Sequence, residues 1–287
     1  SSLAVVLPSM DALINTVWEH LKGYAPDLLP LFETMSQEAK FGRDLLQNDI
    51  RHLSKGAKIL EVGGGIMLLS CQLASEGFDV VAVEPTGDGF SAFEKLRAVI
   101  MELAPVKPRM VTCGIEDFTS DEKFAYAFSI NVMEHVNDAE LAISRVSEVL
   151  APRAVYRFFC PNYLFPYEPH FNIPLIVNKR ITEGFFRDSI HQNKMPDAAG
   201  VWKSLNWIDV LKVKRWVKKD PTLSLEFNTG TLVWMLERVI HDSEFAARRS
   251  RWMVQAIRFM VKLQLHQIAV ILPALLQPIM DVRLEKR

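Results

Sequence analysis

A glycine-rich turn and two carboxylates are the first residues in this sequence that could hold a ligand. The apolar run Lys58–Val62 includes Glu61 and is followed directly by three glycines at positions 63–65. Glycines after a buried strand let the backbone approach a ligand closely. Glu84 ends the next apolar run, where a carboxylate can accept two hydrogen bonds from a ribose diol. Together these features predict a site for an adenosine-bearing ligand.

The spacing of the glycines bears on which ligand this is. In the dinucleotide-binding pattern G-x-G-x-x-G the third glycine would fall on Leu68, so the pattern is incomplete. Glu61, just before the glycines, suits the cationic amino-acid end of S-adenosyl-L-methionine better than a pyrophosphate. An NAD(P)-dependent oxidoreductase stays open as an alternative.

Residues 61–65 resemble the first motif of the class I S-adenosylmethionine-dependent methyltransferases, in which an acidic residue and any residue precede Gly-x-Gly. The group that includes the ubiquinone-biosynthesis O-methyltransferases is especially similar, over about residues 55–162. Segment 113–118 resembles the family's adenine-flanking loop, and segment 131–136 the stretch after the fourth strand. Met67 and Ala125 replace a usual glycine and aspartate, which leaves a non-catalytic, methyltransferase-like binding protein open.

The resemblance implies S-adenosyl-L-methionine as the cofactor. The acceptor it implies is an oxygen, or another nucleophile, of a small, glycan or lipid-linked molecule. The implied cofactor-binding residues are Glu61, Gly63, Gly64, Gly65, Glu84, Ile115, Glu116 and Asn131.

A second cluster of functional side chains directly follows the fifth expected strand. A methyl acceptor needs a base for its proton, and His135 and His170 are the candidates because histidine titrates near neutrality. Side chains expected to touch the acceptor are Glu134, Tyr163, Tyr167 and Glu168. No metal is expected, since Asn131 replaces the first glutamate of a Glu-x-x-Glu-His motif found in some relatives.

The elements that must position these residues alternate between strand and helix, which predicts a mostly parallel sheet with right-handed crossovers. We expect a Rossmann-like open α/β sheet with helices on both faces. Segments 222–227 and 280–285 alternate in polarity and predict two late strands, antiparallel in this family, around a helical insertion. A helix over 204–219 is expected with Ser204 as its cap.

Three segments are expected in the chain. Residues 1–54 would form an N-terminal helical lid and residues 55–162 the cofactor-binding core. Residues 163–287 would supply a substrate lid, the helical insertion and the last strands.

Composition bounds the remaining possibilities. The chain has 287 residues with 49% hydrophobic residues, enough for a large buried core. The absence of a long apolar run and of a paired-cysteine motif predicts a cytoplasmic protein. Residues 161–287 are basic overall, with a polar stripe that includes Arg258, Lys262 and His266. The helices expected in this C-terminal region predict either a cap over the core or peripheral membrane contact. Nucleic acid is not expected as a partner.

Overall fold

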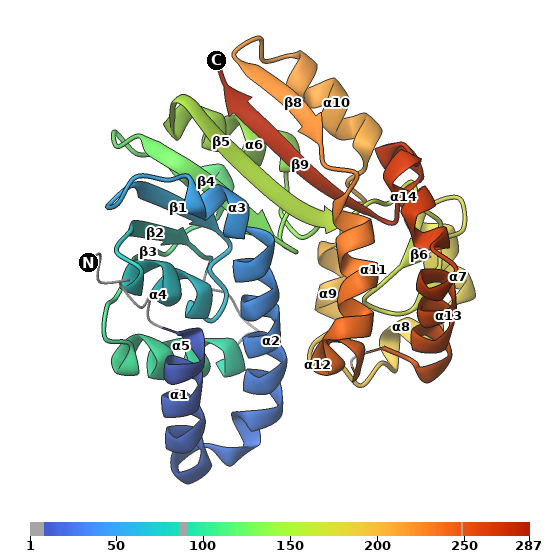
Figure 1. Cartoon of the computed structure of the whole chain (residues 1–287), viewed down its shortest axis with the longest axis horizontal. Helices are drawn as coiled ribbons and strands as arrows, with labels where there is room; N and C mark the ends of the chain where they lie inside the picture. Colours follow the sequence, from blue (N-terminus) through green and yellow to red (C-terminus); the bar gives the residue numbers. More distant parts are fainter. Residues whose placement is uncertain (1–8, 86–90, 248) are drawn as a thin grey trace. The chain divides into compact units, whose positions relative to one another are not determined.

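The computed structural model describes residues 9–85, 91–247 and 249–287, and in this part of the chain a seven-stranded sheet has the order β3-β2-β1-β4-β5-β9-β8 (Figure 1). Its strands are β1 Lys58–Val62, β2 Asp79–Val83, β3 Arg109–Val111, β4 Phe124–Ile130, β5 Leu150–Pro161, β8 Leu223–Phe227 and β9 Ile279–Lys286. β1 pairs in parallel with β2 and β4, and β2 with β3. β9 is antiparallel to β5 and β8. The expected Rossmann-like, mostly parallel sheet with a late antiparallel strand is confirmed.

Contacts between Cα atoms divide the chain into two compact units. Unit 1 ends at Phe128 and also contains Glu148–Ala154, whereas unit 2 consists of Ser129–Ser147 and Val155–Arg287. This division falls within β4 and β5 of the sheet. The boundaries expected at 54 and 162 stay predictions.

Unit 1 is built on strands that are buried on both faces. In β1 and β2 every residue after the first is buried, as expected for central strands of a parallel sheet. Its helices are α1 Met10–Tyr24, α2 Leu29–Leu45, α3 Gln47–Arg51, α4 Leu68–Ser75 and α5 Ser91–Leu103. The sequence predicts a helix over 88–103 between the second and third strands, and it is present from Ser91; residues 88–90 lie outside the described part of the chain.

Unit 2 confirms both late strands. Leu225 lies opposite Leu284 and Phe227 opposite Val282, so the alternating apolar residues of β8 and β9 share one face. Arg157 of β5 and Asp281 of β9 form a buried, two-pronged ion pair at 2.8 and 2.6 Å. Thr231 also donates a hydrogen bond to Asp281, which satisfies the buried carboxylate further.

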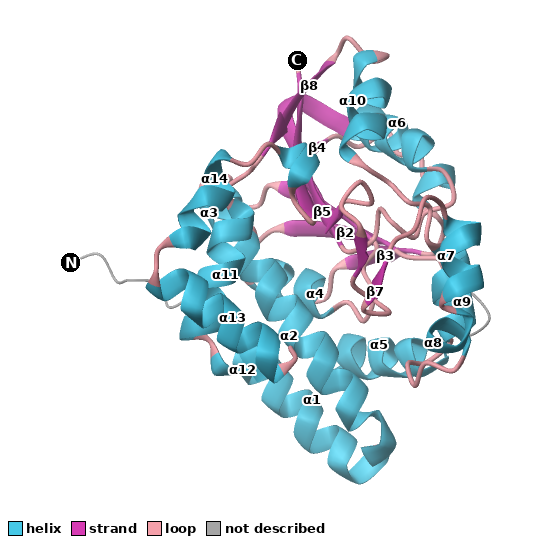
Figure 2. Ribbon diagram, turned by 90° about the vertical axis from the view of Figure 1, so that its right-hand side faces the viewer, coloured by secondary structure: helices cyan, strands magenta, loops and turns pink. Residues whose placement is uncertain are grey.

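The chain between β8 and β9 is helical, as expected. It contains α11 Thr231–His241, α12 Ser243–Ala247, α13 Arg251–Lys262 and α14 Ile268–Ile271. α11 packs against α12, α13 and α14, and Figure 2 shows α11, α12 and α13 side by side. Asn162, fully buried at the end of β5, donates to the carbonyls of Ala274 and Gln277 and so ties this insertion to the sheet.

The segment between β5 and β8 contains short elements: β6 Tyr167–Glu168, β7 Ile173–Pro174, α7 Lys179–Phe185, α8 Arg187–His191, α9 Ala198–Ser204 and α10 Val210–Lys218. The helix expected over 204–219 is wrong at its start. Ser204 ends α9, and the side chain of Asp209 caps α10 by accepting a hydrogen bond from the Lys212 N–H. Segment 205–208 between the two helices is not helical.

Candidate functional site

The glycine turn of unit 1 adopts the left-handed backbone that favours glycine. Gly63 has φ 80° and Gly65 φ 53°, and the Gly63 N–H donates to the Val83 carbonyl at 2.8 Å. Met67, which stands at the third-glycine position of the resembled family motif, also has a positive φ of 68°. Its side chain is fully buried against Gly64, where an added Cβ would come within 2.7 Å of the Met67 sulfur. Met67 therefore adopts a left-handed backbone conformation that is strained for a non-glycine residue, and the burial of its side chain stabilises the turn.

Glu84, just after β2, contacts the glycine turn directly. Its carboxylate accepts a hydrogen bond from the Gly65 N–H at 2.9 Å and lies 3.6 Å from an Arg97 guanidinium nitrogen. Burial raises the pKa of Glu84, while the Gly65 N–H and Arg97 act in the opposite direction. Arg97 of α5 also donates to the Gly65 carbonyl at 2.8 Å. Sequence reasoning missed Arg97, because a helical arginine carries no motif of its own.

Glu61 lies inside the protein rather than at its surface. It is 6% exposed, and the Ser70 hydroxyl donates a hydrogen bond to it. Burial raises the pKa of Glu61 to about 8, the Ser70 hydrogen bond opposes the shift, and the charge of Glu84 adds to it. Near neutral pH this carboxyl group is therefore mostly protonated.

The remaining predicted cofactor residues lie apart from the turn in the chain. Ile115 and Glu116 form a short 3-10 helix, Ile115–Asp117, in which Ile115 is buried and Glu116 half-buried. Asn131 belongs to unit 2 and has a left-handed φ of 54°, which asparagine tolerates better than most residues. The structure brings together the glycine turn, Glu61 and Glu84 in unit 1.

The residues of unit 1 fit an adenosine-bearing cofactor. A Cβ added at Gly65 would meet no atom within 4 Å, so the backbone faces open space there. Beside it, the Glu84 side chain keeps about a fifth of its surface exposed. An accessible backbone next to a carboxylate is the arrangement that a ribose and its neighbouring groups require.

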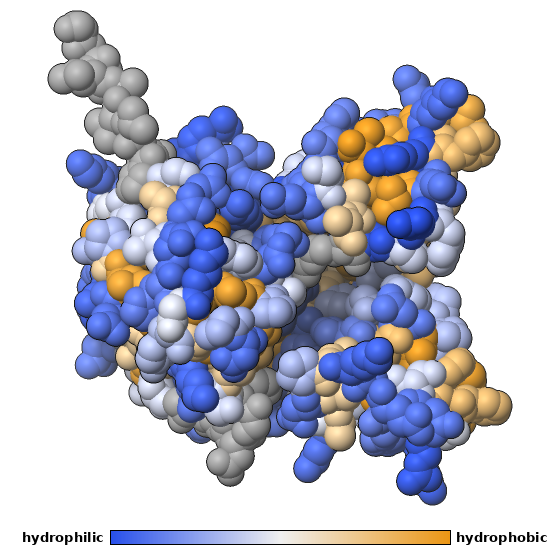
Figure 3. All heavy atoms as spheres, turned by 90° about the horizontal axis from the view of Figure 1, so that it is seen from below, coloured by the Kyte–Doolittle hydropathy of each residue, from blue (hydrophilic) through white to orange (hydrophobic). Residues whose placement is uncertain are grey.

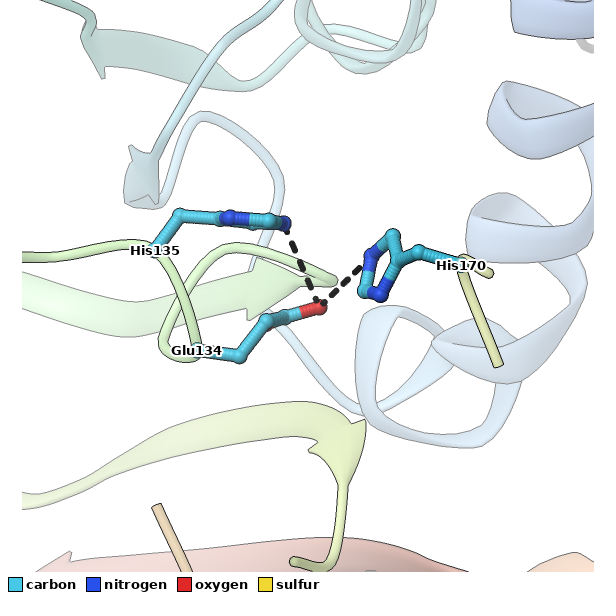
Figure 4. A group of neighbouring side chains, drawn as sticks. All are labelled: Glu134, His135 and His170. Atoms are coloured by element: carbon cyan, nitrogen blue, oxygen red, sulfur yellow. Dashed lines mark ion pairs between the residues drawn. The ribbon is translucent and has the colours of Figure 1, made fainter. Parts of the chain in front are cut away.

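In unit 2, two histidines converge on one buried glutamate (Figure 4). The Nε2 atoms of His135 and His170 each lie 3.9 Å from the same Oε1 of Glu134, a residue with no exposed surface. The two imidazole rings meet edge to face with centroids 5.1 Å apart. One ligand atom from each of the three residues lies within 4.8 Å of the others, so these side chains could also hold a metal ion.

Ser204 fixes which nitrogen of His135 carries the proton. The Ser204 hydroxyl donates to the Val201 carbonyl at 2.8 Å, so it accepts from the Nδ1–H of His135, also at 2.8 Å. The lone pair of His135 is then on Nε2, the atom nearer Glu134. Burial, together with the neighbouring His170, lowers the pKa of His135 to about 4, so the ring is neutral at physiological pH.

His170 is oriented differently, by a carboxylate. Its Nδ1 lies 2.5 Å from the Oε1 of Glu168, a fully buried residue. Glu168 also accepts hydrogen bonds from the Phe171 N–H at 2.7 Å and the Tyr163 hydroxyl at 3.2 Å. Burial and the charge of Glu168 raise the pKa of Tyr163, which remains a phenol. Glu168 therefore holds the His170 ring in place rather than facing solvent.

The structure brings together five of the predicted residues of unit 2: Glu134, His135, Tyr163, Glu168 and His170. Tyr167 lies at the edge of this group, with its hydroxyl donating to Asn172 at 2.5 Å. Sequence reasoning missed Ser204 and also Asn206, whose amide donates to the carbonyls of Met133 and Val136. Both were hidden because the sequence predicted a helix there.

The sequence can now be compared with known proteins. The profile of the family "Methyltransferase domain" matches residues 60–158, which include the glycine turn, Glu84 and the Glu134–His135 pair. Residues 60–158 of this chain are a class I S-adenosylmethionine-dependent methyltransferase domain. The methyltransferase is 54% identical over 279 residues to "Uncharacterized protein Rv1509" of Mycobacterium tuberculosis, covering 97% of this chain and 95% of that protein, and it belongs to the same family.

Two further proteins are more distantly similar to the methyltransferase. It is 30% identical over 105 residues to a ubiquinone biosynthesis O-methyltransferase of Rickettsia akari, covering 37% of this chain and 40% of that protein. A phosphoethanolamine N-methyltransferase 2 of Haemonchus contortus, solved in complex with S-adenosyl-L-methionine, is 16% identical with a TM-score of 0.49. That comparison covers 85% of this chain and 51% of that one. No helix among the residues described is long and apolar enough to cross a membrane.

Proposed function

We propose that this methyltransferase methylates an oxygen, or another nucleophile, of a small, glycan or lipid-linked acceptor, with His170 as the base. The observation that carries the proposal is the 2.5 Å contact between His170 Nδ1 and the buried carboxylate of Glu168. A carboxylate there fixes the tautomer of the ring and stabilises the positive charge that the ring takes up with a proton. Nε2 of His170 is then the atom that accepts the proton of the acceptor.

The proton transfer accompanies a direct displacement. S-adenosyl-L-methionine supplies an electrophilic methyl group on a sulfonium sulfur. As the acceptor atom forms its bond to the methyl carbon and the carbon–sulfur bond breaks, His170 removes the acceptor proton, and S-adenosylhomocysteine leaves as a neutral thioether. The proton later passes from the imidazolium to water, which restores the enzyme.

His135 has a positioning role in this proposal. Its pKa of about 4 keeps it neutral, and its Nε2 lone pair can accept a hydrogen bond from the acceptor. Tyr163 stacks on Trp207 with ring centroids 5.8 Å apart and would form an apolar wall for the acceptor. Holding the acceptor in an attack geometry supplies much of the rate enhancement in such displacements.

On the cofactor side, we propose that Glu84 binds the ribose diol and the glycine turn accommodates the neighbouring atoms. Glu84→Ala removes two charge-assisted hydrogen bonds, each contributing about 1.5–3 kcal/mol, so affinity for S-adenosylhomocysteine should fall at least about a hundredfold. Calorimetric titration measures this, with Glu102→Ala, an exposed carboxylate on α5, as the matched control. Unchanged affinity in a folded Glu84→Ala protein contradicts the assignment.

The acceptor side is tested with isotopically labelled S-adenosyl-L-methionine and fractionated cell extract, followed by detection of the labelled product. His170→Asn should abolish labelling while S-adenosylhomocysteine still binds, and His191→Asn, an exposed histidine paired with Glu183, is the control. Glu168→Gln should lower turnover while S-adenosylhomocysteine still binds, because His170 loses the carboxylate that orients its ring. Full activity of His170→Asn removes His170 from the reaction.

Treatment with a chelator tests whether the cluster of Glu134, His135 and His170 acts through a base or holds a catalytic metal ion. If Glu134, His135 and His170 work without a metal, EDTA leaves the labelling rate unchanged and added divalent cations do not raise it. A rate that EDTA abolishes and one divalent cation restores assigns the cluster to a metal instead.

A further inference from the structure

The helical insertion of unit 2 exposes an unusual amount of apolar surface. Within the described residues, nearly half of the exposed large hydrophobic side chains lie between Trp252 and Leu276. This stretch includes α13, the 3-10 helix Leu265–Gln267 and α14. Contiguous exposed apolar surface on a folded protein marks an interaction site more often than chance.

α13 carries the best-defined part of this surface. Trp252, Phe259 and Leu263 are 70, 63 and 51% exposed, and their spacing of seven and four residues places them on one side of the helix. Ile257 lies on the other side and is buried. The exposed side of an ordinary amphipathic helix is polar, whereas this helix is apolar on its buried side and again on part of its exposed side.

Basic side chains flank the exposed apolar side chains. Arg251, Arg258 and Lys262 are all exposed, and in the part of the chain that the structure describes none of the three forms an ion pair. The segment from Phe245 to Met280 contains no aspartate or glutamate, so no carboxylate within the segment neutralises them. Figure 3 shows apolar and strongly hydrophilic side chains next to each other at its upper right, the region in which Figures 1 and 2 together place α12 and α13.

The expected polar stripe does not extend beyond α13. His266 is 6% exposed and lies 3.1 Å from the Glu237 carboxylate, so it belongs to the interior of the insertion. After it, Ile268 and Ile271 are 51 and 79% exposed. The exposed surface is therefore basic and apolar along α13 and apolar along α14.

We propose that this surface, formed by Arg251, Trp252, Arg258, Phe259, Lys262 and Leu263, binds peripherally to an anionic lipid bilayer. Tryptophan and phenylalanine are favoured at the headgroup boundary, and nearby Arg and Lys are attracted to acidic headgroups. Because segment 245–280 contains no carboxylate, its charge has one sign and complements the uniformly negative surface of an anionic bilayer. The proposal is independent of the methyl acceptor and of the catalytic roles proposed above.

Vesicle binding tests the proposal with the whole chain. Wild-type protein should sediment with vesicles containing 30% phosphatidylserine, and should not sediment with pure phosphatidylcholine vesicles. Each basic residue near such a surface contributes about 1 kcal/mol, so Arg258→Gln with Lys262→Gln should weaken the partition about thirtyfold. Trp252→Ser with Phe259→Ser should weaken it on the same vesicles, and unchanged melting temperatures show that the variants fold.

A matched double variant distinguishes this surface from a net-charge effect. Arg215→Gln with Lys218→Gln removes the same charge from exposed positions of α10 and should leave vesicle binding unchanged. The tryptophan emission should shift to shorter wavelength on binding, and the shift should be absent in Trp252→Phe.

Three results would overturn the proposal. The first is no binding to anionic vesicles, and the second is an equal loss of binding in the two double-charge variants. The third is self-association in the absence of lipid, measured by sedimentation velocity and abolished by Trp252→Ser, which would assign the surface to a second copy of this chain.

Discussion

The buried carboxyl group of Glu61 predicts how the stability of unit 1 depends on pH. Glu61→Gln keeps the shape of the side chain and an oxygen for the Ser70 hydroxyl, but it removes the titration. The pKa of Glu61 is about 8 in the folded protein, against 4.5 for an ordinary glutamate. Between these two values the folded state holds a proton that the unfolded state has lost.

The magnitude follows from proton linkage. One pKa unit corresponds to about 1.4 kcal/mol, so a shift from 4.5 to about 8 corresponds to about 5 kcal/mol. The contribution is fully present below pH 4.5 and is lost as the pH rises through 8, because the folded state must then bury a charge. Relative to Glu61→Gln, the wild-type protein should lose about 1.4 kcal/mol for each pH unit within this window.

Urea unfolding of both proteins at pH 5, 6, 7 and 8 measures the difference. Comparison with the variant is necessary because His135, with a pKa lowered to about 4, makes stability rise with pH between 4 and 6.5 in both proteins. Ser70→Ala removes the donor that favours the carboxylate, so the loss of stability should continue above pH 8. Parallel pH profiles for wild type and Glu61→Gln would refute the reasoning, since they require an ordinary Glu61.

Three further predictions concern folding. Gly64→Ala should lower the free energy of unfolding by about 1–3 kcal/mol, because its Cβ would lie 2.7 Å from the Met67 sulfur; chemical denaturation measures this, and an unchanged midpoint contradicts the packing. Arg157→Leu should cost about 3–5 kcal/mol because it leaves the Asp281 charge buried, and adding Asp281→Leu should recover much of the loss in the same assay. Deletion of residues 280–287 should abolish cooperative melting, since it removes most of β9, which pairs with both β5 and β8; a soluble truncate with wild-type melting would contradict this.

Three strands of the parallel part of the sheet could be predicted with their exact bounds, whereas β3 is shorter and β5 longer than the sequence indicates. The sequence predicts β1 at Lys58–Val62, β2 at Asp79–Val83 and β4 at Phe124–Ile130, as the structure has them, because each is a short apolar run bounded by turn residues. β8 and β9 were found from their period-two alternation, which survives because one face of each is more exposed. Local sequence patterns were therefore sufficient to predict these strands.

The acceptor side could be predicted only by residue type. His135 and His170 were singled out, but their meeting around Glu134 depends on contacts between residues far apart in sequence. The start of the helix predicted over 204–219 is wrong because a serine before an amphipathic stretch is a common N-cap. In the structure, Asp209 is the N-cap instead. Nothing in the local sequence indicates that Ser204 would contact His135.

The position of β9 has a consequence for how the protein is made. β9 lies between β5 and β8, yet it leaves the ribosome more than a hundred residues after β5 and about fifty after β8. Until it emerges, β8 lacks its partner and β5 presents an open edge, a state prone to wrong pairing. In unit 1, β1 and β2 can pair as soon as both have emerged. The nascent chain therefore completes the cofactor-binding strands early, while the edges of β5 and β8 stay unpaired until β9 has been synthesised.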